Sequence, residues 1–375
     1  MAGIYIHIPF CARRCIYCGF FSTSMADRKE QYAKSVCAEL ELQKDWLRGE
    51  PVSTLYLGGG TPSQLSLAQI EMITEAVRNY PGTGDIRELT IECNPDDITA
   101  EFVRGVSQLG FNRISMGVQS FDDGMLGFLR RRHNADQAIR AVRTCQENGI
   151  RNVSIDLMYG LPGQTLEMQE SDVRLAISLG VSHISSYCLS YEPDSPLDRL
   201  RQAGQITPCS DETCESMFNQ MCNLLDQAGY RHYEISNFCR EGMKSMHNSN
   251  YWNGTPYLGI GAGAHSFDGN ERRWNPDNLD LYIRCMSQGK LCFENEILSV
   301  EDKYNECLML GLRTSDGICL DSIRKRFGEK YYNQLRRNAA PFIASGKLKE
   351  ERGCLRFPQD SLFISDSIIS SLFAD

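Results

Sequence analysis

The sequence predicts an α/β fold in which repeated strand–helix units surround a parallel sheet. Short β-rich runs alternate with stretches whose apolar residues recur at helical spacing, as in strands joined by crossover helices. We expect six strands, at 4–8, 54–57, 88–92, 113–118, 152–158 and 183–189. Polar or glycine residues follow nearly every strand at its C-terminal end, where α/β barrels carry their functional residues. These loops should therefore converge on one site.

The segments between the strands have apolar faces that indicate helices packed on a core. One face comprises Tyr32, Val36, Leu40 and Leu47, and another comprises Ile70, Ile73, Val77 and Tyr80. We assign both faces to core packing, because this spacing places their side chains on one side of a helix.

The strand–helix repeat fades after about residue 200. A long helix is expected over 207–230, followed by a segment rich in Asn, Gly, His and aromatic residues. From residue 299 the pattern predicts helices over 301–312, 320–327 and 331–343, a hairpin over 347–357 that turns at Gly353, and a last helix over 362–373. This order resembles a winged-helix-like α+β module. We therefore expect three parts, at 1–230, 231–298 and 299–375.

Composition restricts the class of protein. With 375 residues, 42% hydrophobic and 23% charged, the chain has the composition of a soluble globular protein of about two domains. Its net charge of -9 disfavours general nucleic-acid binding. The sequence lacks the run of about 18 apolar residues that a membrane span requires, and polar residues interrupt its start where a signal peptide would be apolar. We expect a cytoplasmic protein without a membrane span.

The chain contains 16 cysteines. In a large intracellular protein these are more typical of thiols and metal ligands than of a disulfide framework. Most stand alone on apolar faces, where cysteine is usually a small buried hydrophobe, and are assigned no chemistry: Cys37, Cys145, Cys188, Cys222, Cys285, Cys307 and Cys319. Cys11, Cys15 and Cys18 differ, because they crowd into one loop after the first strand.

Three thiolates at C-x3-C-x2-C spacing favour an iron–sulfur cluster. Zinc is the weaker interpretation, because a structural zinc site needs four protein ligands and no second nearby cysteine pair occurs. Three cysteine ligands on a four-iron cluster leave one iron open to another molecule. The remaining alternative, that the three are incidental in a cysteine-rich chain, does not explain their grouping directly after a strand.

This loop resembles the signature of the radical S-adenosylmethionine (SAM) enzymes. In that family the open iron binds the amino and carboxylate groups of SAM, and an electron from the cluster splits the sulfonium. The run Gly58, Gly59, Gly60 and Thr61 supports the resemblance, because a strand-end loop without side chains lets backbone groups reach a charged ligand. The resemblance implies a partial (β/α)6 radical SAM barrel, a 4Fe–4S cluster and SAM.

Further motifs resemble the oxygen-independent coproporphyrinogen III oxidase family. They are IYIHIPFC at 4–11, GGGTP at 58–62, ECNP at 92–95, MGVQSF at 116–121 and IDLMYGLP at 155–162. This resemblance implies SAM contacts at Tyr5, Gly59, Gly60, Thr61, Glu92, Gln119, Arg131 and Asp156. Carboxylates can accept hydrogen bonds from ribose hydroxyls or an ammonium group, and an arginine can pair with a carboxylate. Arg130 and Arg132 flank Arg131, so the register of this arginine stays open.

Two departures separate the chain from the oxidases proper. The oxidases carry a fourth cysteine two residues after the third, where this chain has Phe20, and they have a longer segment before the cluster loop. In both respects the chain resembles a sister branch, the HemW-type haem chaperones. The H-N-x-x-Y-W motif of that branch occurs here at 247–252, and the segments 258–267 and 308–313 also resemble it.

The HemW-type resemblance implies a haem site. A neutral imidazole is a normal axial ligand of haem iron, and Tyr or Trp beside it can lie along a porphyrin. His247 is therefore the leading candidate for the haem iron, with Tyr251 and Trp252 beside it and His265 as a second candidate. The alternative is a structural histidine. The C-x-x-C-H motif of c-type haem attachment does not occur.

Two functions follow from these resemblances. The first is haem binding and delivery to an acceptor protein, which can be soluble or membrane-bound, with the cluster, SAM and an electron donor as accessories. The second is oxidative decarboxylation of coproporphyrinogen III, or another radical reaction on a tetrapyrrole. A third and weaker interpretation uses residues 313–356, where 11 Lys+Arg against 5 Asp+Glu give 11 − 5 = +6. Such a module can touch nucleic acid, but a solvated basic face is commoner, so we expect no nucleic-acid partner.

Overall fold

The computed structural model describes residues 1–374 and contains a 12-stranded sheet. Its centre consists of six consecutive parallel strands: β1 (Ala2–Ile8), β2 (Val52–Gly59), β3 (Glu88–Cys93), β4 (Arg113–Gln119), β5 (Asn152–Tyr159) and β6 (His183–Cys188). These are the six strands expected from the sequence, each within a few residues. The predicted α/β fold with a partial parallel barrel is confirmed.

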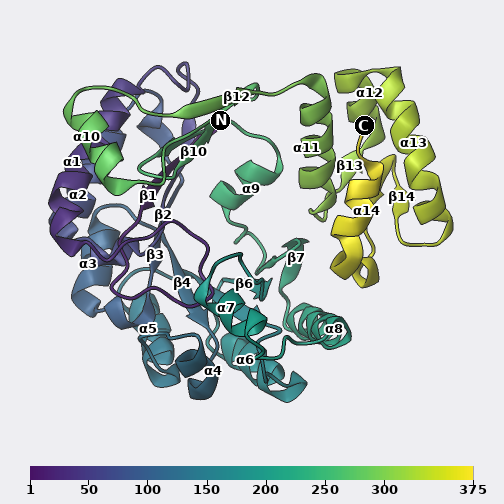
Figure 1. Ribbon diagram of the computed structural model, residues 1–375, viewed down its shortest axis with the longest axis horizontal. Coiled ribbons are helices and arrows are strands. Elements are labelled where there is room, and N and C mark those ends of the chain that lie inside the picture. The colour runs from purple at the N-terminus through teal and green to yellow at the C-terminus, as the bar shows by residue number, and fades with distance from the viewer. Residues whose placement is uncertain (375) are drawn as a thin grey trace.

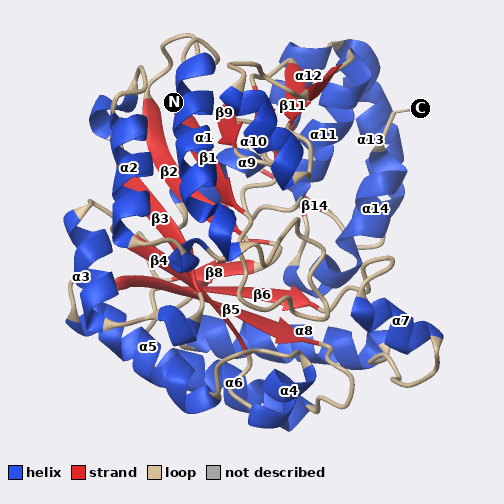
Figure 2. Cartoon of the chain, turned by 60° about the vertical axis from the view of Figure 1, so that its left-hand side comes forward, coloured by secondary structure: helices blue, strands red, loops and turns tan. Residues whose placement is uncertain are grey.

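Helices cover the outer face of these strands (Figure 2). They are α1 (Lys29–Leu42), α2 (Leu67–Arg78), α3 (Ala100–Gln108), α4 (Asp123–Phe128), α5 (Ala135–Glu147) and α6 (Leu166–Ser178). Most begin at a side-chain cap; Ser66 and Gln69, for example, form a capping box at the start of α2. Both apolar faces predicted from helical spacing are buried in the core, including Tyr32 and Ile70 at 0% exposure. The crossover helices therefore bury their apolar faces against the sheet.

Residues 231–298 extend the same sheet at both edges. Beyond β6 lie β8 (Asn237–Cys239) and β7 (Arg231–Glu234). Beyond β1 lie β9 (Tyr257–Ile260), which runs parallel to β1, then β10 (His265–Phe267), β11 (Glu271–Trp274) and β12 (Glu294–Ile297). The helices α9 (Met246–Trp252) and α10 (Leu279–Ser287) connect these strands. The boundaries expected after residues 230 and 298 remain a prediction.

The helix expected over 207–230 is shorter than predicted. A separate short helix, α7 (Pro196–Gln202), comes first, and α8 covers Asp211–Gln227. The Ser210 side chain caps α8 by accepting a hydrogen bond from the backbone N–H of Thr213. Gly229, with a φ of 82°, lies just beyond the other end of α8, in a conformation that terminates helices.

The C-terminal residues form a small module with its own core. It comprises α11 (Val300–Leu312), β13 (Ile318–Cys319), α12 (Leu320–Phe327), α13 (Glu329–Ala344), β14 (Lys349–Glu351), β15 (Cys354–Arg356) and α14 (Ser365–Leu372). Leu308, Leu335 and Leu355 are buried at its centre. Figure 1 shows the module beside the barrel, with α9 in the space between them. The order of helices and hairpin matches the winged-helix-like expectation. Asp375, the last residue of the expected third part, lies outside the described residues.

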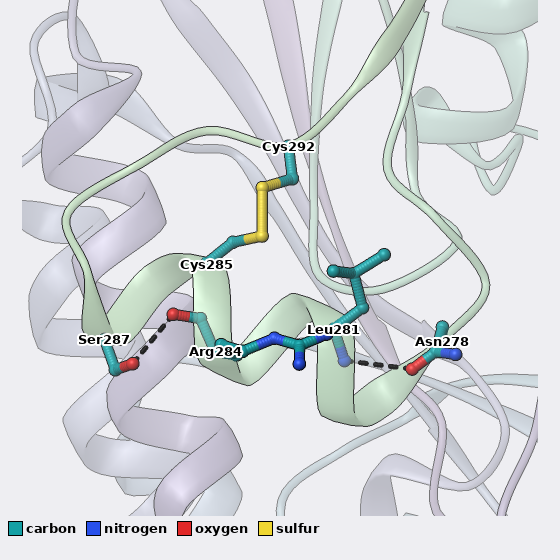
Figure 3. Close-up of a disulfide and its surroundings, with 6 residues drawn as sticks. All are labelled: Asn278, Leu281, Arg284, Cys285, Ser287 and Cys292. Atoms are coloured by element: carbon teal, nitrogen blue, oxygen red, sulfur yellow. Dashed lines mark hydrogen bonds between the residues drawn. A yellow bond between two sulfur atoms is a disulfide. The ribbon is translucent and has the colours of Figure 1, made fainter.

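One cysteine expected to be isolated is paired instead. Cys285, in the last turn of α10, forms a disulfide with Cys292 (Figure 3). The chain reverses at Gly289, which has a φ of 66°, and so brings Cys292 back over α10. The expectation that Cys285 is a lone buried thiol is wrong, because it neglected this turn. The other six cysteines assigned no chemistry are free thiols, but Cys188 and Cys319 are exposed, so the expectation that they pack as buried hydrophobes is wrong for these two. Within residues 1–374, no helix has both the length and the apolar character needed to cross a bilayer.

Candidate functional site

The C-terminal ends of the parallel strands open into one cavity of about 660 Å³. Its wall contains Cys11, Cys15 and Cys18 together with seven of the eight candidate SAM contacts: Gly59, Gly60, Thr61, Glu92, Gln119, Arg131 and Asp156. Residues from five separate loops therefore lie around one space, as the polar residues at the strand ends led us to expect.

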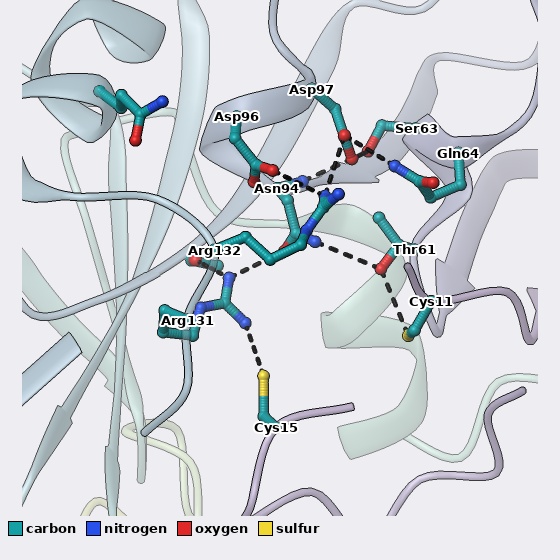
Figure 4. A network of polar contacts seen from close by, with 12 residues as sticks. Cys11, Cys15, Thr61, Ser63, Gln64, Asn94, Asp96, Asp97, Arg131 and Arg132 are labelled. Atoms are coloured by element: carbon teal, nitrogen blue, oxygen red, sulfur yellow. Dashed lines mark hydrogen bonds and ion pairs between the residues drawn. The ribbon is translucent and has the colours of Figure 1, made fainter. Parts of the chain in front are cut away.

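The cluster loop follows β1 and contacts Thr61, just after β2, and Arg131, just after α4 (Figure 4). Cys11 Sγ lies 3.4 Å from Thr61 Oγ1, and Arg131 Nη1 donates a hydrogen bond of 3.2 Å to Cys15 Sγ. Burial raises the pKa of the Cys11 and Cys18 thiols. A bound metal deprotonates coordinating thiols outright. The three half-buried thiols line one cavity, but among the described residues no three Cys, His, Asp or Glu side chains are grouped closely enough to hold a metal ion, so the cluster is inferred from the spacing of the three cysteines and from their shared cavity.

The three consecutive arginines have different environments. Arg131 Nη2 donates to Asn94 Oδ1 at 2.8 Å and to the backbone oxygen of Gly117, while its buried Nε has no partner among the described residues. Arg132 instead pairs with Asp96 and Asp97, at 3.0 and 2.9 Å. Arg130 has a φ of 58° and its side chain is exposed. Arg131 is thus the arginine that reaches the cluster loop and still has an unused donor.

The glycine run after β2 approaches its neighbours too closely for any side chain. A Cβ at Gly60 would lie 2.7 Å from the backbone carbon of Pro9, and one at Gly59 would lie 2.4 Å from the His7 ring. Gly59 also has a φ of 108°, which L residues rarely adopt. Both glycines line the cavity beside the cluster loop, and their backbone N–H groups are held within the protein, that of Gly59 by Glu92 and that of Gly60 by the backbone oxygen of Ile8.

Two carboxylates form the inner part of the cavity wall. Glu92, near the end of β3, accepts hydrogen bonds from the Tyr56 hydroxyl at 2.8 Å and from the backbone N–H of Gly59 at 2.9 Å. Asp156 projects from β5 into the same space. Burial raises the pKa of Glu92 to about 7 and that of Asp156 to about 6. Both groups can therefore change charge near neutral pH.

Tyr5 is the one candidate SAM contact outside the cavity wall of the described structure. Its hydroxyl lies 3.0 Å from His7 Nδ1, and His7 Nε2 donates to the backbone oxygen of Phe21 at 3.0 Å. Tyr5 and His7 thus support the cluster loop from beneath.

Sequence reasoning missed several residues of the wall. Tyr56, Asn94, Ser115, Ser185 and Tyr187 line the cavity as well. Four of them, all except Asn94, lie on strands. Each of the four is two residues along its strand from another residue that faces the inside of the barrel. Because strand side chains alternate between faces, this period of two was the signal that could have found them.

The candidate haem residues lie on α9, beneath the cavity. His247 is 1% exposed; its Nδ1 lies 2.8 Å from Thr54 Oγ1 and its Nε2 lies 2.9 Å from the Tyr251 hydroxyl. Glu88 anchors the start of α9 by accepting from the backbone N–H groups of Met246 and His247. Burial lowers the pKa of His247 to about 3, so its imidazole is neutral at physiological pH.

The neighbours of His247 are more accessible. Tyr251 and Trp252 are half-buried, and Asn248 on the same helix lines the cavity. His265, the second haem candidate, is exposed on β10 and stacks on Trp274 with ring centroids 6.0 Å apart. The structure thus places α9 close to the cavity and His265 elsewhere on the sheet.

Comparison with known proteins identifies the family. Residues 5–176 match the radical SAM superfamily, and residues 298–363 match the HemN C-terminal domain. The chain is 34% identical to the heme chaperone HemW of Bacillus subtilis, over 89% of this chain and 88% of that protein. The chain belongs to the HemW family. The HemW of Escherichia coli is 33% identical, over 87% of this chain and 89% of that protein.

The same fold occurs in a solved structure. That structure is the coproporphyrinogen III oxidase HemN of Escherichia coli, with a TM-score of 0.86 and 22% identity, over 100% of this chain and 90% of that one. At this identity the likeness shows the fold alone. Membership of the radical SAM superfamily implies a 4Fe–4S cluster and SAM for this HemW family member.

Proposed function

We propose that the protein is a cytoplasmic haem chaperone that binds haem and delivers it to acceptor proteins. The observation that carries this proposal is the neutral His247 of the H-N-x-x-Y-W segment, held on a helix directly beneath the radical SAM cavity. The presence of Phe20 in place of a fourth cysteine supports a carrier over a coproporphyrinogen oxidase. The matches to proteins named heme chaperone HemW, which cover 87–99% of this chain, support the same conclusion.

The cavity residues fit a cluster and SAM. Cys11, Cys15 and Cys18 would hold the cluster and leave one iron for SAM; when bound, the cluster supplies an electron to SAM. The guanidinium of Arg131, which lines the cavity, suits the carboxylate of SAM, because guanidinium–carboxylate pairs are strong and directional. Glu92 and Asp156 would accept hydrogen bonds from the ribose hydroxyls or the ammonium group.

The raised pKa values of these carboxylates predict pH-dependent SAM binding. Glu92 and Asp156 are partly protonated at pH 6 in the empty protein, and only the ionised forms accept hydrogen bonds at both oxygens. SAM affinity should therefore fall about tenfold between pH 8 and pH 6, and binding at pH 6 should release protons. Titration calorimetry in two buffers of different ionisation enthalpy measures both effects. Glu92→Gln should flatten the profile; equal affinity at both pH values without proton release would count against this assignment.

The hydrogen bonds of His247 suggest how it would accept haem iron. If Nδ1–H donates to Thr54, the Nε2 lone pair is free to accept from Tyr251, and the same lone pair can bind iron. The second partner of a ligating histidine commonly fixes its tautomer in this way. Movement of the half-buried Tyr251 would expose Nε2, with Trp252 beside it to lie along the porphyrin. The haem-accepting protein and an electron donor for the cluster are the partners that this function requires.

A haem titration tests the proposal. His247→Ala should weaken haem binding at least tenfold, since it removes the axial ligand, while cluster iron and sulfide stay at the wild-type level. His265→Ala is the comparison variant and should bind haem normally. Absorbance titration of both variants measures the difference. Unchanged haem binding in His247→Ala, or loss in His265→Ala alone, would remove the assignment.

A further inference from the structure

Gln119, one of the candidate SAM contacts, has an unusual backbone. Its φ is 74°, in the left-handed region that residues other than glycine rarely adopt. It lies at an irregularity in β4, where the register with β5 shifts between Gly117 and Gln119. Gln119 is 8% exposed and lines the cavity. A strained residue in a functional cavity persists only when its surroundings hold it there.

The segment after Gln119 is held from outside the barrel. Asp172 Oδ2 accepts a hydrogen bond of 2.7 Å from the Ser120 hydroxyl, and Asp172 Oδ1 accepts one of 2.8 Å from the backbone N–H of Phe121. The same Ser120 hydroxyl accepts from the backbone N–H of Asp122 at 3.0 Å. The two residues that follow Gln119 are therefore fixed by a single carboxylate on α6.

The segment before Gln119 is fixed independently. Arg131 donates to the backbone oxygen of Gly117, and His133 Nε2 donates to that of Val118 at 3.1 Å. With both flanks held, the backbone at Gln119 must bridge them, and the left-handed conformation does so with the side chain directed into the cavity. Asp172 itself is 5% exposed, and burial raises its pKa to about 6. Burying a carboxylate at such a position costs folding free energy unless hydrogen bonds offset it, and here the bonds from Ser120 and Phe121 do so.

We propose that Asp172 is a positioning residue of the SAM site, which acts through Ser120 and Phe121 to hold Gln119 in its left-handed conformation. This inference rests on the proposed SAM-binding function. It assigns to α6, a helix on the outer face of the barrel, a role in cofactor affinity.

The test uses the full chain with its reconstituted cluster, and measures the change in the cluster spin-resonance spectrum as SAM is added. Asp172→Ala should weaken SAM binding about tenfold, which corresponds to about 1.4 kcal/mol. Asp172→Asn keeps one acceptor oxygen and should lose about threefold, which covers the case in which the alanine variant fails to fold. Haem affinity and iron content should not change. The matched control is Gln169→Ala on the same helix, since Gln169 is 2% exposed and its side-chain amide makes no hydrogen bond among the described residues.

A double-mutant cycle separates positioning from general destabilisation. Glycine adopts the left-handed region freely, so in a Gln119→Gly background the Asp172→Ala change should cost no further SAM affinity. An equal loss in both backgrounds, or wild-type SAM affinity in both Asp172 variants, would overturn the inference. If SAM leaves the spectrum of the unmodified protein unchanged, the proposed SAM site and the inference both fall; if the unmodified protein responds, the Asp172 variants test the inference alone.

Discussion

Alanine at any one of Cys11, Cys15 and Cys18 is expected to remove the four-iron cluster. The reason is that three thiolates are the whole protein ligand set in this account, and iron–sulfur clusters are held by cysteine thiolates. Loss of one leaves two ligands for a four-iron centre. Iron and sulfide analysis should fall from four of each per chain to near zero, and the low-temperature spin-resonance signal of the reduced protein should disappear.

The matched control for these variants is Cys188→Ala. Cys188 is exposed and lines the same cavity, but it lies at the end of β6 and not in the cluster loop. It should keep the full iron content and signal. A complete four-iron signal in any of the three single variants would show that the loop is not the ligand set.

Arg131→Met is expected to weaken SAM binding by about 2 kcal/mol, or roughly thirtyfold. Methionine keeps much of the length and apolar stem of arginine but removes the donors that reach Cys15, Asn94 and the cavity. The guanidinium would otherwise form a charge-assisted pair with the SAM carboxylate. SAM titration on the reconstituted protein measures the loss.

Arg130→Met serves as the neighbouring control. Arg130 is exposed at the cavity mouth, so its replacement should change SAM affinity by less than about threefold. If Arg130→Met instead weakened SAM binding more than Arg131→Met, the SAM contact would lie at Arg130, and the assignment of Arg131 would be contradicted.

The sheet and the convergence of its loops could be predicted because both depend on local pattern. The run Gly58–Gly59–Gly60 directly after an apolar strand indicated a close backbone approach, and the structure shows that a Cβ at Gly60 would meet Pro9 at 2.7 Å. The parallel arrangement then brings Glu92 and Asp156 to the same end of the sheet. Residue type and position relative to a strand end were sufficient here.

The contacts of His247 could not be predicted in the same way. Its Nδ1 partner, Thr54, is 193 residues away in the chain, and no local spacing indicates that pairing. The Cys285–Cys292 disulfide depends on a reversal at Gly289, and the position of Tyr5 below the cavity depends on the layering of inward-facing residues. Each of these features is set by tertiary packing between segments that the sequence treats separately.

We expect this HemW family member to carry haem and to leave porphyrinogens without decarboxylation. The most direct test is chromatography of the tetrapyrroles after anaerobic incubation of the cluster-loaded protein with coproporphyrinogen III, SAM and a reductant. We expect coproporphyrinogen III to be recovered unchanged. Conversion to protoporphyrinogen IX, with its two vinyl groups, would contradict this expectation.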